Sequence, residues 1–142
     1  MNEDFVPYEL AVKLKEKGFE CGHPLAMYNE KGVFHDLCTS AEYMISASGF
    51  ECRCYYDYED FDEHDCVAPT ISQVLKWLRK EKIFVVIAVN PTLSTKDKIA
   101  YYYQVYPNSN GVTSDYYESE ECYAQWEDCA IYSIKYVLDN LI

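Results

Sequence analysis

The sequence lacks an apolar run long enough to cross a membrane. Nowhere in its 142 residues does an apolar stretch reach the roughly 18 residues that a membrane-spanning helix needs. The first five residues are acidic and have neither the basic start nor the apolar centre of a secretory signal. These absences predict no membrane partner and a cytoplasmic location in the producing cell, and they leave association with a virion open.

Positive charge is also scarce. Twelve Lys and Arg residues stand against twenty-four Asp and Glu, which gives a formal net charge of −12. Because such a surface repels phosphate backbones, we expect no direct binding of DNA or RNA. A basic protein surface is the better candidate partner, and neither its identity nor the oligomeric state follows from the sequence.

Complete catalytic motifs are missing as well. The sequence has no phosphate loop, no dinucleotide fingerprint and no Ser-His-Asp set, and it has only three histidines. Cys38 lies near His35 and Asp36, but closeness in sequence does not supply the geometry that a Cys-His nucleophile requires. We therefore expect a non-catalytic accessory or protein-binding protein, with an enzyme as the minority hypothesis.

Cysteine is abundant, and it carries the alternative hypothesis. Seven cysteines cannot all pair internally, and without an export signal thiols are expected rather than bridges. A zinc-stabilised module or small hydrolase would use Cys52, Cys54, His64 and Cys66, with Cys38 as a further candidate, since three thiolates and one imidazole are an accepted zinc set. The single residue between Cys52 and Cys54 is shorter than usual zinc spacing, and strand alternation also explains that pair.

Residues 57–65 carry six carboxylates in nine positions. A calcium loop of the EF-hand type needs a glycine at its sixth position, and no glycine lies between Gly49 and Gly111. We expect instead an exposed acidic loop, anchored to the protein by Tyr58 and Phe61. The candidate interaction residues are Asp57, Tyr58, Glu59, Asp60, Phe61 and Asp62.

The centre of the chain reads as a helix followed at once by a strand. Apolar residues at helical spacing predict a helix over residues 69–82, started by Pro69 with Ala68 as its cap. Residues 83–89 are apolar on both faces, which predicts a central strand buried on both sides and antiparallel to residues 99–106. The other expected elements are helices over 4–18, 39–48 and 119–141, a hairpin of 25–28 and 33–35, and strands over 50–56 and 112–117. This order predicts one α+β domain over residues 1–142, with an antiparallel sheet (hairpin plus meander) covered by the N-terminal, central and C-terminal helices.

Fifteen tyrosines make the chain unusually aromatic. Tyrosine suits half-buried sheet faces and is also enriched at interfaces. Sheet packing is the expected role, and an interface role gains support if several tyrosines are exposed together.

The helix centre Ala68-Pro69-Thr70-Ile71-Ser72-Gln73-Val74-Leu75-Lys76-Trp77-Leu78-Arg79-Lys80-Glu81-Lys82 resembles a pattern, APxxxQxxxWxRxKx, of small proteins encoded by gut Bacteroidales bacteria and by their phages and mobile elements. The opening Val6 to Phe19 and a last helix entered through tyrosine and paired glutamates look like the same group. The resemblance covers about half the chain and omits residues 38–66. It implies a shared fold and context, and no activity comes with it.

Overall fold

Helices and short antiparallel strands alternate along the chain in a computed structural model, which describes residues 4–21, 24–36, 44–46, 49–51, 64–107 and 115–142. The expected α+β class is thereby confirmed. The chain divides into two compact units, here called the N-terminal unit (Phe5–Pro69) and the C-terminal unit (Thr70–Ile142 together with Asp4). That these units form one domain stays a prediction.

In the N-terminal unit, helix α1 (Tyr8–Glu16) contacts a three-stranded antiparallel sheet through β5. The strand order is β2-β1-β5, with bounds β1 (Ala26–Tyr28), β2 (Phe34–Asp36) and β5 (Cys66–Val67). The β1–β2 hairpin is confirmed. Its turn closes because the Asn29 side-chain oxygen accepts the amide hydrogens of Lys31 and Val33, and Gly32 adopts a positive φ of 78°.

Helix α1 is shorter than the predicted range 4–18, because it begins at Tyr8 and ends at Glu16. Pro7 is the N-cap rather than the first helical residue. Gly18, with φ 83°, follows the C-cap, and the Phe19 amide donates to the Leu14 carbonyl at 2.9 Å. This left-handed ending is one that glycine adopts without strain.

Strands β3 (Met44–Ser46) and β4 (Gly49–Glu51) form an antiparallel hairpin. The helix expected over residues 39–48 is therefore wrong at 44–46. The prediction rested on the capping-box pattern Thr39-Ser40-Ala41-Glu42. Such a cap is a local preference of about 1 kcal/mol, which strand pairing overrides.

In the C-terminal unit, helix α3 (Ile71–Lys80) buries Ile71, Val74 and Leu78, as its spacing predicts. Its start is different from the prediction. Thr70, not Ala68, is the N-cap, and a capping box joins its side chain to the Gln73 amide while the Gln73 side chain accepts the Thr70 amide. Threonine followed three residues later by glutamine is a capping-box pattern, which the proline before it obscured.

A three-stranded antiparallel meander follows in the order β6-β7-β8, with bounds β6 (Phe84–Val89), β7 (Tyr101–Tyr106) and β8 (Tyr117–Glu118). The antiparallel pairing of β6 with β7 is confirmed. The central position of residues 83–89 is wrong: β7 is central, and β6 is the edge strand among the described residues. Its buried faces are wrong too, because Phe84, Val86 and Val89 are 37%, 43% and 48% exposed.

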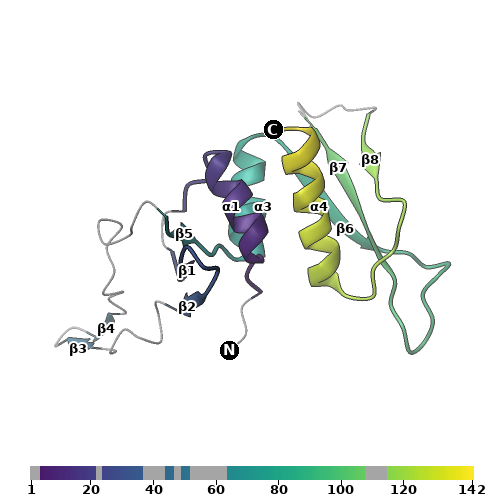
Figure 1. The fold of residues 1–142 in the computed structure, drawn as a ribbon. Coiled ribbons are helices and arrows are strands. Elements are labelled where there is room, and N and C mark those ends of the chain that lie inside the picture. The colour runs from purple at the N-terminus through teal and green to yellow at the C-terminus, as the bar shows by residue number, and fades with distance from the viewer. Residues whose placement is uncertain (1–3, 22–23, 37–43, 47–48, 52–63, 108–114) are drawn as a thin grey trace. The chain divides into compact units, whose positions relative to one another are not determined.

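One helix covers one face of this meander, which explains the error. Helix α4 (Trp126–Asn140) packs against β7 and β6 and beside α3, and Figure 1 shows it lying along the sheet. It begins at Trp126 rather than at Ser119, whose amide instead donates to the Tyr103 carbonyl and extends the β7–β8 pairing. An apolar strand shows that burial would be favourable on both faces, but not that the chain supplies two covering layers. In the described part of the chain no helix is long and apolar enough to span a membrane.

Candidate functional site

The face of the meander that no described helix of the C-terminal unit covers is the candidate functional site. Side chains alternate across a strand, so the register places one set on this face, named here the open face: Phe84, Val86, Ala88, Tyr102, Gln104, Tyr106 and Glu118. Tyr116, which is 51% exposed, stacks on Tyr106 with ring centroids 5.2 Å apart. The open face is thus aromatic and aliphatic, with one polar strip.

The polar strip is held by a chain of hydrogen bonds. The Tyr106 hydroxyl donates to the Gln104 side-chain oxygen at 3.0 Å, and the Gln104 amide nitrogen donates to the Glu118 carboxylate at 3.0 Å. These bonds fix the side chains before any partner arrives. A fixed aromatic surface loses little conformational entropy on binding.

The opposite face packs against α4 through a tyrosine cluster: Tyr103, Tyr117, Tyr123, Tyr132 and Tyr136. The tightest pair is Tyr117 and Tyr136, parallel within 7° at 3.8 Å between ring centroids. Burial raises the pKa of Tyr103, and Tyr117 and Tyr123 add to the rise. The expected packing role of the tyrosines is therefore seen on the covered face. On the open face Tyr116 is exposed and Tyr102 and Tyr106 are half-buried, and an interface role stays a prediction.

Two cysteines flank this cluster in contrasting surroundings. Cys129 on α4 is fully buried, and burial, with a smaller effect of Cys122, raises the pKa of its thiol to about 12. Cys122 is exposed, and its sulfur accepts a hydrogen bond from the side-chain Nδ2 of Asn90 at 3.6 Å. Cys129 is a packing residue, while Cys122 is open to reagents.

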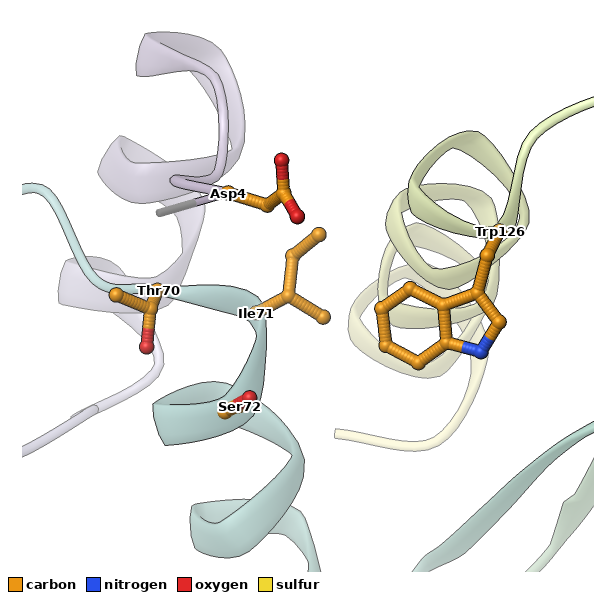
Figure 2. A pocket seen from close by; sticks show the side chains of 5 residues that line it. All are labelled: Asp4, Thr70, Ile71, Ser72 and Trp126. Carbon is orange, nitrogen blue, oxygen red and sulfur yellow. The ribbon is translucent and has the colours of Figure 1, made fainter. Parts of the chain in front are cut away.

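Two hollows lie in the C-terminal unit. The first, of about 270 Å³, lies between the starts of α3 and α4, and Figure 2 shows Asp4 and Ile71 pointing toward the indole of Trp126. A helix start can bind anions through free amide hydrogens. Here the Ile71 amide already donates to the Asp4 carbonyl at 2.9 Å, and the capping box takes those of Thr70 and Gln73. With a carboxylate beside them, these groups do not make an anion site.

The second hollow is a groove of about 410 Å³ beside the start of β7. Leu93 and Ile99, 60% and 48% exposed, and the Cys122 thiol line it. A thiol nucleophile requires a base, and no histidine occurs in residues 70–142. Among the described residues, the groove is a mostly apolar surface with Asp97 and Lys98 in its lining, and it is not an assembled catalytic set.

The residues expected to bind zinc are only partly described. His64 is exposed, and Cys66 is buried on β5. Burial raises the pKa of the Cys66 thiol, with Lys15 lowering it and Asp65 raising it, so this thiol resists becoming the thiolate that zinc binds. Cys38, Cys52 and Cys54 lie outside the described residues, within which no group of three metal-binding side chains occurs. Zinc binding stays a prediction.

The acidic interaction segment also lies outside the described residues. This applies to all six of its candidates, Asp57, Tyr58, Glu59, Asp60, Phe61 and Asp62. The open face was missed because the strand pattern over residues 99–106 separates Tyr101 and Tyr103 from Tyr102 and Tyr106 without showing which set is covered. A better indication of an aromatic open face was the composition of this strand, because its tyrosines occupy both odd and even positions and so lie on both faces of the sheet.

Comparisons with protein-family models, with curated proteins and with solved structures find no match to this chain.

Proposed function

We propose that the protein is a non-catalytic protein-binding module that contacts its partner through the open face. One observation carries the proposal: Phe84, Val86 and Tyr116 are 37%, 43% and 51% exposed on one sheet face, while the other face is packed under α4. Tyr102 and Tyr106 beside them are half-buried. Contiguous exposed apolar surface on a soluble protein commonly marks an interaction site. Tyrosine-rich surface with few charges resembles the centre of protein interfaces.

Charge supports a protein partner over a nucleic acid. The net charge of −12 favours basic protein surfaces around the open face and raises their association rate at low salt. It disfavours phosphate backbones. The Bacteroidales and phage context implied by the helix resemblance gives the cells in which to seek the partner.

Capture of partners from extracts of the producing cells at low salt tests the proposal. The wild-type protein is compared with Tyr102→Glu, on the central strand of the open face, and with Tyr132→Glu, the same change at a half-exposed member of the tyrosine cluster on the opposite face, where Tyr132 is 49% exposed. We expect the wild type and Tyr132→Glu to retain one partner and Tyr102→Glu to lose it. Thermal unfolding confirms that both variants fold. Equal capture by all three proteins would rule out the open face, and turnover of a metabolite would rule out a purely binding role.

A further inference from the structure

The outer edge of β6 presents unpaired backbone groups. In an antiparallel pair, opposite residues exchange hydrogen bonds at every second position. The Asn90 amide donates to the Ala100 carbonyl at 2.7 Å, and the register then assigns Phe84, Val86 and Ala88 to the bonds with β7. The amides and carbonyls of the alternate residues therefore point away from β7; these residues are Val85, Ile87 and Val89.

The hydrogen bonds on the other side of β7 give the same assignment of residues to the two neighbouring strands. Tyr101 exchanges backbone hydrogen bonds with Tyr123, and the Tyr103 carbonyl accepts the Ser119 amide. The odd residues of β7 are thus engaged toward β8, which leaves its even residues for β6. No described strand pairs with the outer edge of β6.

Within the described residues of the C-terminal unit, this edge has no lysine, proline, bulge or paired strand to protect it against strand addition. Native proteins guard edge strands with lysine, proline, bulges or a covering element. Residues 84–89 are Phe-Val-Val-Ile-Ala-Val, paired with β7 without interruption. Six consecutive apolar residues, of which Val85, Ile87 and Val89 direct their backbone donors and acceptors outward, form an edge on which an extended peptide can dock.

The charge at the two ends of β6 indicates what kind of peptide this edge would bind. Residues 71–100 hold six of the twelve basic side chains and two of the twenty-four acidic ones, a net charge of +4 in a chain of −12. Lys80 and Lys82 precede β6, and Lys96 and Lys98 follow it. All four are exposed, and none forms an ion pair within the described part of the chain.

We propose that β6 accepts, as an added strand, an extended segment of a partner protein whose apolar centre is flanked by carboxylates. This inference rests on the proposed binding function and specifies the docking strand; the acidic remainder of the chain keeps its preference for basic surface. A second copy fits less well. Antiparallel β6–β6 pairing would bring the Lys80 and Lys82 end of one copy to the Lys96 and Lys98 end of the other, between two molecules of net charge −12.

The probe is a synthetic fluorescent peptide with a Val-Thr-Val-Thr-Val-Thr centre and two glutamates at each end, measured by fluorescence anisotropy against the full chain. Two control peptides change one property each: one has lysine flanks, and one has N-methylated amides that cannot donate to an edge. We expect binding of the glutamate peptide, weaker binding as salt rises, and about ten-fold or greater loss for each control. Equal affinity for all three peptides would overturn the proposal.

Protein variants locate the site. Ile87→Pro removes an outward amide hydrogen and leaves the bonds with β7 in place, and Ile87→Val keeps that hydrogen. We expect about ten-fold weaker binding for Ile87→Pro and little change for Ile87→Val. Lys82→Gly combined with Lys98→Gln should weaken binding about three-fold and reduce the salt dependence. Since the peptide controls use wild-type protein, the test does not depend on whether Ile87→Pro folds.

Analytical ultracentrifugation tests whether a second copy of the chain, rather than a peptide, occupies the edge of β6. A wild-type dimer that Ile87→Pro dissociates would show that β6 pairs with a second copy and would overturn the peptide proposal. Failure of peptide binding, with Tyr102→Glu still losing the captured partner, would remove the β6 inference alone. Loss of neither would remove the proposed function.

Discussion

Lys82 follows the C-cap of helix α3, in a backbone conformation that is strained for any residue with a Cβ atom. Its φ is 62°, the one positive value among the non-glycine residues described. The ending otherwise matches that of α1: the Ile83 amide donates to the Leu78 carbonyl at 2.9 Å, as Phe19 donates to Leu14. The same motif is thus built once with glycine and once with lysine.

Lys82→Gly should therefore stabilise the protein by roughly 0.5–1 kcal/mol, because glycine adopts positive φ without the steric cost of a Cβ. Gly18→Ala, at the corresponding position of α1, should cost about 1 kcal/mol, since a Cβ there meets no atom within 4 Å and the cost is conformational. Urea unfolding measures both. A loss of stability in Lys82→Gly would mean that the lysine side chain makes a compensating contact.

The buried Cys129 thiol predicts sensitivity to alkali. Its pKa is raised from the ordinary value of 9.0 to about 12, so between these values the unfolded chain has lost a proton that the folded chain retains. The free energy of unfolding should then be unaffected by this group below about pH 9 and should fall as pH rises toward 12. Cys129→Ala should reduce that slope, and Cys122→Ala, which removes only the smaller contribution to the raised pKa, should reduce it less.

The same contrast predicts thiol chemistry. At pH 8 the exposed Cys122 should react with an aromatic disulfide reagent in the native protein, whereas Cys129 should react only after unfolding. Mass spectrometry of the labelled peptides distinguishes the two. Fast labelling of native Cys129 would show that α4 opens readily from the sheet.

At the scale of elements, the start of α3 depends on the capping box. Thr70→Ala should cost about 1 kcal/mol, because the Gln73 amide loses its acceptor. Thr70→Ser keeps the oxygen and should cost less. If Gln73→Ala and Thr70→Ala proved additive in a double-mutant cycle, the two halves of the box would be independent.

The attachment of α4 depends on the tyrosine cluster. Replacing Tyr117 and Tyr136 by leucine, singly and together, should give a coupling energy of about 0.5–1.5 kcal/mol for their stacked rings. Tyr106 and Tyr116 on the open face provide the matched pair, and their coupling should be smaller because Tyr116 is half exposed. Thermal unfolding of the two cycles tests this order.

Periodicity in the sequence predicted the helices and the β6–β7 pairing better than it predicted their surroundings. The buried residues Leu10, Leu14, Val74 and Leu78 follow from helical spacing alone. The predicted helix starts at Ser119 and Pro69 were wrong, although each residue satisfies a local rule for starting a helix. In the folded chain Ser119 pairs with Tyr103 instead, and Thr70 caps α3. The open face could not be predicted, since the number of covering layers is a property of packing rather than of any one segment.

At the scale of the whole molecule, opposite charges lie in different parts of the chain. Residues 71–100 carry +4 and the remainder −16, although composition alone suggests a uniformly acidic protein. Two kinds of ligand should therefore bind in a salt-dependent way. Basic partners should dissociate from the acidic part of the chain as salt rises, and acidic-flanked peptides should dissociate from residues 71–100 over the same range of salt. Substituting the lysines around β6 should abolish only the second of these responses to salt, as measured by binding isotherms over a salt series.

The unguarded edge of β6 also has a consequence for solubility. A flat, apolar edge can template the stacking of further strands into aggregates, and mutual repulsion between copies of net charge −12 opposes this at neutral pH. Near the isoelectric point, at about pH 4.5, that repulsion vanishes while the edge persists. Light scattering and thioflavin binding should then rise more steeply for the wild type than for Ile87→Pro. That difference would show that aggregation on acidification begins at β6.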